Sequence, residues 1–221
     1  MYTIIKRIMD IMFSLILLIL FLPIFIPIII LLILTAEGEV LYFQERLGYK
    51  NKFFQIWKFA TMLKNSLQMG SGSITLKGDF RVTKVGAFLR KTKINELPQI
   101  INILKGDISF VGPRPLLLTS FESYSESIQS KIYNVKPGLT GIGSIIFRDE
   151  ESLLSSIKNG DPHVYYQKII APYKGELELW YQDNRSFITD LKIIFITAWV
   201  VIFPSSFLVF KVFKDIPARK F

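Results

Sequence analysis

The sequence predicts an α+β protein with an N-terminal re-entrant membrane helix (helix-break-helix), a small mixed cytosolic domain and interfacial amphipathic helices. Three observations support this prediction. An uncharged apolar run near the N-terminus contains two prolines, the central part alternates strand-like and helical patterns, and a second apolar stretch lies near the C-terminus. We expect a re-entrant membrane helix at 1–35, a cytosolic domain at 36–186 and an interfacial C-terminal segment at 187–221.

The composition excludes several classes of protein. Half of the 221 residues are hydrophobic, so the chain is not a disordered polar segment. With no cysteine and one histidine, His163, we expect no disulfide scaffold, thiolate metal site, cysteine catalysis or Ser-His triad. A net charge of +9 on so apolar a chain suits an anionic membrane lipid surface. No recognition-helix or single-strand motif is present, so we expect no nucleic-acid partner.

The apolar run from Ile11 to Leu34 is 24 residues long and carries no charge. As a helix it would extend about 36 Å, enough to cross a bilayer core of about 30 Å. Pro23 and Pro27 lie in the middle of this run, and one mid-helix proline costs about 3 kcal/mol. Basic residues flank both ends, so the positive-inside rule assigns no direction. A helix that breaks or sharply bends at the prolines and leaves on the face it entered explains both observations; a kinked spanning helix is the alternative.

The next part of the chain predicts a strand pair, a loop and a helix. Apolar residues at Val40–Phe43 and Phe53–Phe59 predict two short strands around a polar turn. The segment 63–78 reads as a loop with glycine and serine at 70–73, either a mobile segment over a site or a surface linker. Apolar residues at helical spacing predict a helix over Val82–Lys91.

A second helix is expected to begin at Asn95. Asn95 is a strong N-cap type, Glu96 falls in the first turn, and Pro98 is tolerated there. Apolar residues follow at positions i, i+3, i+4 and i+7 from Leu97, and Gly106 ends the helix.

The remaining elements are less regular in pattern. We expect helix over Ser120–Val135 and a turn over Lys136–Gly141. Asp149–Glu151 brings three consecutive carboxylates, which are either a solvated helix start or ligands at a site. The uncharged stretch Ile193–Phe210, divided by Pro204, predicts a helix lying in the membrane interface, with a second spanning helix as the alternative.

Several residues of the central part suit phosphate chemistry. Arg114 lies between two prolines, a basic cluster occupies 90–93, and a helix N-terminus follows at Asn95. Arginine forks and helix N-termini both stabilise phosphate oxygens. Glu96 and Asp107 could hold a divalent metal that screens a diphosphate. Each feature also has a structural explanation, since a glutamate in a first turn usually answers the helix dipole.

A set of motifs in a fixed order resembles one known family over nearly the whole chain. The motifs are Lys58-Phe59-Ala60-Thr61-Met62, Asp79-Phe80-Arg81-Val82-Thr83 with Gly86 and Arg90, Asn95-Glu96-Leu97-Pro98-Gln99, Gly106-Asp107-Ile108-Ser109-Phe110-Val111-Gly112-Pro113-Arg114-Pro115, and Lys136-Pro137-Gly138-Leu139-Thr140-Gly141. This order is similar to that of the bacterial sugar transferases, the monotopic phosphoglycosyl transferases of polysaccharide and glycoconjugate synthesis.

The resemblance implies an activity, a cofactor and a location. A sugar-1-phosphate passes from a UDP-sugar to polyprenyl (undecaprenyl) phosphate and UMP leaves, as the first membrane step of exopolysaccharide, O-antigen or glycoconjugate synthesis. The family uses Mg²⁺, a re-entrant helix and an Asp-Glu dyad whose aspartate forms a covalent phospho-sugar intermediate. The implied location is the cytoplasmic face of the bacterial inner membrane. The sugar is not identified, and a homo-oligomer stays open.

The matched motifs imply a set of site residues. Glu96 and Asn95 are expected at the catalytic dyad, and Glu96 with Asp107 at the metal. Pro23 and Pro27 are expected in the membrane. The expected substrate-binding residues are Lys58, Arg81, Arg90, Pro113, Arg114 and Pro115.

The dyad of this chain has Asn95 where the resemblance implies an aspartate. A carboxamide is neutral and cannot form an acyl phosphate without losing its nitrogen, although it caps a helix as well as aspartate does. Three hypotheses follow. Glu96 or an acid from Asp149–Glu151 is the nucleophile; or the lipid phosphate attacks directly while Mg²⁺ and Arg114 stabilise the transition state; or the protein is a catalytically silent nucleotide-sugar or partner-binding module.

Overall fold

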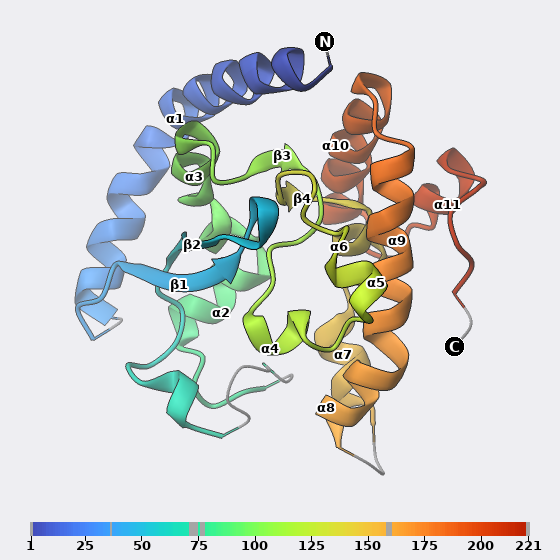
Figure 1. Ribbon diagram of the computed structural model, residues 1–221. Coiled ribbons are helices and arrows are strands. Elements are labelled where there is room, and N and C mark those ends of the chain that lie inside the picture. Colours follow the sequence, from blue (N-terminus) through green and yellow to red (C-terminus); the bar gives the residue numbers. More distant parts are fainter. Residues whose placement is uncertain (1, 36, 71–74, 76–77, 158–160, 220–221) are drawn as a thin grey trace.

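The computed structural model describes residues 2–35, 37–70, 75, 78–157 and 161–219 (Figure 1). Most of the predicted Gly-Ser centre at 70–73 lies outside these residues. Within these ranges helices predominate, with one antiparallel and one parallel pair of strands. The predicted α+β class is therefore confirmed.

Helix α1 (Tyr2–Thr35) contains both Pro23 and Pro27, and Figure 1 shows it bending around one side of the molecule. The helix continues through both prolines, so the expected interruption is a bend rather than a break. Among the described residues, α1 is the one helix long and apolar enough to cross a membrane. Most of its apolar side chains are exposed, whereas Ile28 and Leu32 pack with Phe59 and Leu89 of the domain.

The two predicted strands form a hairpin. Strand β1 (Leu41–Leu47) pairs antiparallel with β2 (Phe53–Phe59), so the first strand extends to Leu47 rather than ending at Phe43. A 3₁₀ turn at Tyr49–Asn51 connects them. Because side chains alternate along a strand, Tyr42, Gln44 and Arg46 share one face, and the register places Lys58 opposite Tyr42 on that face.

The expected helix over Val82–Lys91 is present as α2 (Lys84–Lys91). The Thr83 hydroxyl accepts a hydrogen bond from the Gly86 N–H at 2.9 Å, which caps the first turn. Gly86 lies so close to the backbone at Thr61 that a Cβ atom would be 2.0 Å from the Thr61 carbonyl oxygen. A short 3₁₀ helix at Ser66–Gln68 precedes α2 within the predicted loop.

The predicted N-cap at Asn95 is wrong. Asn95 lies inside a 3₁₀ turn at Ile94–Glu96, and α3 (Gln99–Lys105) begins only after Pro98. The bonds before α3 span three residues, from the Leu97 N–H to the Ile94 carbonyl at 3.1 Å and from the Ile100 N–H to the Leu97 carbonyl at 3.0 Å, so this stretch is a 3₁₀ turn and not the first turn of an α-helix. The C-terminus of α3 agrees with the prediction, since Gly106 adopts a φ of 90°.

The expectations for 120–141 need correction. Two short helices, α4 (Leu118–Phe121) and α5 (Glu126–Gln129), replace the single helix expected over Ser120–Val135. The expected turn contains strand β4 (Gly138–Thr140), which pairs in parallel with β3 (Ser109–Val111). A Cβ on Gly138 would lie 2.1 Å from the Gly112 nitrogen, so glycine permits this approach.

The C-terminal part is helical and shares the main core. Buried residues of β3, α9 and α10, such as Val111, Leu177 and Ile193, form one cluster. Helix α10 has 16 residues, short for the approximately 20 that a membrane span needs, and exposes Phe195 and Trp199 on its other face. The elements are α6 (Ile142–Ile146), α7 (Glu150–Ser155), α8 (Pro162–Tyr165), a π-helical turn (Tyr166–Ile170), α9 (Ala171–Asp183), α10 (Phe187–Ile202) and α11 (Leu208–Val212).

Candidate active site

A cleft of about 1290 Å³ lies between the β1–β2 hairpin, α2, the Asn95–Glu96 turn and the helices that follow residue 142. Polar and charged side chains of several predicted site residues line it. Those that the structure brings together in this cleft are Lys58, Arg90, Asn95, Glu96 and Arg114.

Glu96 lies in an electropositive part of the cleft. Its side chain is largely buried, and its Oε1 atom is 3.9 Å from Nη2 of Arg114. Burial alone would raise the pKa of Glu96, but neighbouring positive charges outweigh burial and lower that pKa. Glu96 is therefore an ionised carboxylate at neutral pH. The neighbours are Lys58, Arg114, Lys93 and Arg46.

Asn95 is 7% exposed and contributes to the wall of the cleft. Its Oδ1 atom accepts no hydrogen bond from any residue that the structure describes. A buried oxygen without a donor costs about 1–3 kcal/mol, so such an atom in a cleft calls for an explanation. A cation or a ligand hydroxyl or N–H in the cleft would satisfy it.

Two cations on the hairpin face, Lys58 and Arg46, share Glu96 as an acidic neighbour. Burial lowers the pKa of Lys58 to about 7, with Glu96 opposing that change. Burial likewise lowers the pKa of Arg46 to about 10, and the Arg114 charge lowers it further. Arg46 donates to the neutral Gln44 side chain at 2.5 Å, and within the described parts of the chain neither Arg46 nor Lys58 forms an ion pair. This wall of the cleft is therefore suited to an anion.

The backbone around Arg114 is held from both sides. The Tyr133 hydroxyl donates to the Arg114 carbonyl at 2.8 Å and accepts from the Leu116 N–H at 2.9 Å. The Arg114 N–H donates to Oε1 of Glu178 at 3.4 Å. Pro113 and Pro115 are buried and stiffen the same segment. The guanidinium of Arg114 is thus presented to the cleft from a rigid backbone.

Glu178 and Arg46 were missed by the sequence reasoning. Glu178 is 2% exposed on α9, and burial raises its pKa to about 7. Lys174, Glu178 and Tyr181 recur at helical spacing in an otherwise apolar setting, which was the available signal. For Arg46 the available signal was the alternation of side chains along a strand, which places Arg46 on the same face as Gln44.

Two predicted residues lie elsewhere. Arg81 is 1% exposed, pairs with Asp79 and donates to the carbonyls of Ser66 and Met69, so it organises the 66–69 loop. Asp107 accepts from Asn102 at 2.9 Å and pairs with Lys105 at 3.2 Å. Asp107 follows the C-terminus of α3 whereas Glu96 precedes its N-terminus, so the two carboxylates are not brought together. In the described ranges, no group of three or more His, Asp or Glu residues could hold a metal alone.

The three consecutive carboxylates at 149–151 lie at a helix start beside the cleft, and a role as ligands stays a prediction. Helix α7 begins at Glu150, as a helix start would. Glu150 and Glu151 also line the cleft, but each faces a cation: Lys174 lies 2.5 Å from Glu150 and Arg90 lies 3.8 Å from Glu151. These pairs tie the wall built by α7 and α9 to α2.

The sequence is similar to those of known sugar transferases over most of its length. The profile of the bacterial sugar transferase family matches residues 1–204. The uncharacterised sugar transferase EpsL of Bacillus subtilis is 37% identical over 194 residues, covering 88% of this chain and 85% of EpsL. The UDP-glucose:undecaprenyl-phosphate glucose-1-phosphate transferase of Klebsiella pneumoniae is 36% identical over 199 residues, covering 88% of this chain and 39% of that protein.

A third relative extends the same comparison. The undecaprenyl-phosphate galactose phosphotransferase of Salmonella typhimurium is 32% identical over 211 residues, covering 89% of this chain and 40% of that protein. The chain therefore spans most of the length of the Bacillus protein but about two fifths of the two larger transferases.

Proposed function

The chain belongs to the bacterial sugar transferase family, and from this premise we propose that it transfers a sugar-1-phosphate from a UDP-sugar to polyprenyl (undecaprenyl) phosphate. The observation that carries the proposal is the cleft, in which the carboxylate of Glu96 lies among several cationic side chains. The names of the Klebsiella and Salmonella relatives supply the substrate class.

The charge of the cleft supports a diphosphate substrate. Arg46 and Lys58 form no ion pair with any described residue, and Glu96 is the acidic neighbour that both share with Arg114. Three cations therefore surround one carboxylate. Diphosphate oxygens would supply the missing negative charge and accept the guanidinium hydrogen bonds. Arg114 would keep stabilising the phosphoryl group as charge shifts toward the leaving UMP.

The bent apolar helix supports a membrane-side location. We propose that α1 enters and leaves the membrane on the cytoplasmic face, with the bend near Pro23 and Pro27 in the bilayer. The exposed apolar side chains of α1 and of α10 would contact lipid. This placement would bring the cleft within reach of a lipid-borne phosphate.

Glu96 is the favoured nucleophile. Its ionised carboxylate oxygen would attack the sugar-bearing β-phosphorus and form an acyl phosphate, and the bond from that phosphorus to the bridging oxygen would break to release UMP. An oxygen of polyprenyl phosphate would then attack the same phosphorus and free the Glu96 carboxylate. Glu150 and Glu151 are weaker candidates, because Glu150 is held by Lys174 at 2.5 Å and the side chain of Glu151 is 46% exposed.

The residues present fit Mg²⁺ only together with substrate. Mg²⁺ is commonly held by one or two carboxylates plus substrate phosphates. Glu96 and the unpartnered Oδ1 of Asn95 are adjacent oxygen donors that, with diphosphate oxygens, would hold it. Bound there, the ion would screen the charge on the phosphates. Asp107 does not line the cleft and would not contribute.

Asn95 also favours a second candidate function. If the carboxylate absent at this position is required, the chain is a silent module that binds nucleotide sugar. Such a module would keep the cationic cleft and its affinity for UDP-sugar while showing no turnover.

UMP release separates these possibilities. Purified protein with Mg²⁺ and a panel of UDP-sugars should release UMP, stoichiometrically without lipid if Glu96 forms the intermediate. Release that begins only when polyprenyl phosphate is added would establish direct attack instead. Binding of UDP-sugar without any UMP, with lipid present, would overturn the transferase proposal and leave the silent module.

A further inference from the structure

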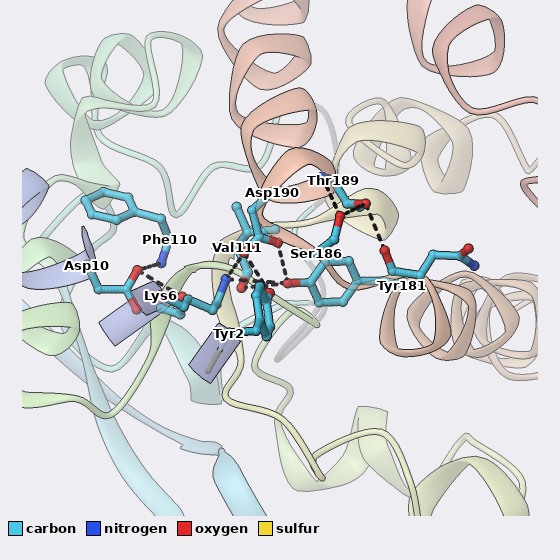
Figure 2. Close-up of polar contacts among 11 residues, drawn as sticks. Tyr2, Lys6, Asp10, Phe110, Val111, Tyr181, Ser186, Thr189 and Asp190 are labelled. Atoms are coloured by element: carbon cyan, nitrogen blue, oxygen red, sulfur yellow. Dashed lines mark hydrogen bonds and ion pairs between the residues drawn. The ribbon is translucent and has the colours of Figure 1, made fainter. Parts of the chain in front are cut away.

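The charged residues at the start of α1 face the protein rather than solvent or lipid. Lys6, Arg7 and Asp10 are spaced so that they lie on one side of the helix. Figure 2 shows this side against the domain, with Asp10 directed at Phe110 while Tyr2 and Lys6 approach Asp190. In the sequence these charged residues only flank an apolar run, whereas in the fold they contact the domain.

Arg7 binds the C-terminal end of α3, the helix that follows the turn containing Asn95 and Glu96. Its guanidinium donates to the carbonyls of Ile103 at 2.5 Å and Leu104 at 2.6 Å. These carbonyls belong to the last turn of α3, where intrahelical donors are missing. Arg7 therefore fixes the position of α3 along α1, and with it the turn that precedes α3.

Asp10 makes the corresponding contact with the strand that leads to Arg114. Its Oδ1 atom accepts from the Ser109 hydroxyl at 3.0 Å and from the Phe110 N–H at 3.1 Å. Asp10 is 5% exposed, so these donors have no water to replace it. Strand β3 passes directly from Phe110 into Gly112 and the segment that presents Arg114.

A third contact closes the same corner of the molecule. Asp190 of α10 accepts from Tyr2 at 2.8 Å, Lys6 at 2.5 Å and Tyr181 at 2.7 Å. The Tyr181 oxygen is also 3.3 Å from the carbonyl of Val111. The start of α1, α10 and β3 are thereby joined through buried polar atoms (Figure 2).

We propose that Asp10 is a positioning residue that sets β3, and through it Arg114, by the docking of the membrane helix. The role in turnover rests on the proposed transferase function. Without Asp10, two donors at the start of β3 would lose their acceptor, and the segment would depend on its pairing with β4 and on the contacts of Tyr133 and Glu178 with Arg114. Small displacements of a phosphate-binding arginine have large effects on rate.

Three variants on α1 and β3 test this role. Asp10→Ala removes the acceptor, whereas Asp10→Asn keeps an Oδ1 that can accept both bonds. Ser14→Ala is the matched control, because Ser14 lies one turn further on the same buried face and its Oγ has no partner in the described structure. Ser109→Ala removes one of the two bonds and serves if Asp10→Ala does not fold.

Hydrogen exchange over 109–116 and the kinetics of UMP release are measured on full-length protein in lipid nanodiscs. Asp10→Ala should speed exchange in this segment and lower kcat/KM about tenfold or more, Ser109→Ala should give a smaller change in both, and Asp10→Asn and Ser14→Ala should match wild type. In an Arg114→Ala background, Asp10→Ala should cause no further kinetic loss, because its effect passes through Arg114.

Several results would overturn the assignment. Equal losses in Asp10→Ala and Asp10→Asn, independent losses from Asp10 and Arg114, or unchanged exchange over 109–116 in Asp10→Ala and Ser109→Ala would each do so. If wild type binds UDP-sugar but releases no UMP, the proposed function fails while the exchange data still decide whether Asp10 holds the segment.

Discussion

Two neighbouring side chains of one 3₁₀ turn have different surroundings. Glu96 is ionised among cations, whereas Asn95 has a buried oxygen without a described partner. In the proposed function the first would be the nucleophile and the second a ligand atom for substrate or metal. Only the Glu96 carboxylate could then form a bond to phosphorus, because the Asn95 amide is neutral.

Glu96→Gln should lower kcat by about 10³-fold or more, because the amide cannot form the acyl phosphate. UMP release with UDP-sugar, lipid and Mg²⁺ measures this. Glu151→Gln is the matched control, since that carboxylate lies on the rim with a 3.8 Å ion pair, and it should retain activity. Full activity in Glu96→Gln would show that Glu96 balances the neighbouring positive charges and is not the nucleophile.

Asn95→Asp should permit a second route. The new carboxylate would be a nucleophile and a stronger ligand for Mg²⁺ than the amide, so release of UMP without lipid should increase. Intact-protein mass spectrometry should detect the phospho-sugar adduct after incubation with UDP-sugar alone. Absence of both the increase and the adduct would count against the proposed geometry around position 95.

The pKa of Lys58, about 7 because of burial, predicts pH-dependent binding. The protonated form carries the charge that a diphosphate needs, so affinity should be full below pH 7 and fall as pH rises. The Kd for UDP-sugar should increase about tenfold between pH 6 and pH 8 if only the protonated form binds. Lys58→Arg should flatten this dependence. Because Glu178, with a pKa of about 7, titrates in both proteins, the difference between their two pH profiles is the part that belongs to Lys58. A flat wild-type profile would contradict the assignment.

At the scale of elements, local patterns predicted those parts whose partners are near in sequence. The hairpin at 41–59, helix α2 and the Gly106 stop follow from alternation, helical spacing and a left-handed cap. Strand β4 has three residues and gains its partner β3 from elsewhere in the chain, so no periodicity predicts it. Asn95 was assigned to a cap because its residue type suits one, but the bonds before α3 follow the 3₁₀ pattern and the α-helix begins at Gln99.

The close approach of α2 to the loop after β2 gives a prediction at this scale. Gly86→Ala would place a Cβ atom 2.0 Å from the Thr61 carbonyl, so the helix must shift. The free energy of unfolding should fall by about 1–3 kcal/mol, and the displaced Arg90 should weaken UDP-sugar binding. Denaturant unfolding and calorimetry check this, with the exposed neighbour Ala87→Ser as the control. An unchanged stability would mean that this contact is looser than the structure indicates.

At the scale of the whole molecule, the site residues could be predicted only where the chemistry was local. Lys58, Glu96 and Arg114 come together because the hairpin, the 3₁₀ turn and the loop after β3 all face one cleft. Arg81 and Asp107 carry suitable groups but point to local partners, which no motif distinguishes from substrate contacts. The division into parts at 35 and 186 stays a prediction.

The topology of α1 is testable because the chain contains no cysteine. Thr3→Cys and Lys50→Cys place single thiols at exposed positions on either side of the apolar run. If α1 is re-entrant, a membrane-impermeant maleimide should label both only from the cytoplasmic side. Labelling from opposite sides would establish a spanning helix, and a thiol placed by Glu122→Cys on an exposed part of the domain is the control for sidedness.

The contact of Tyr2 with Asp190 joins residues 188 positions apart. During synthesis the helix that contains Tyr2 leaves the ribosome well before its partner on α10. In the proposed membrane topology the apolar helix would reach lipid before the domain exists to receive its polar side, and final docking would close a loop of 188 positions. Premature termination before α10 should yield a chain that is held by the membrane yet cannot complete its fold.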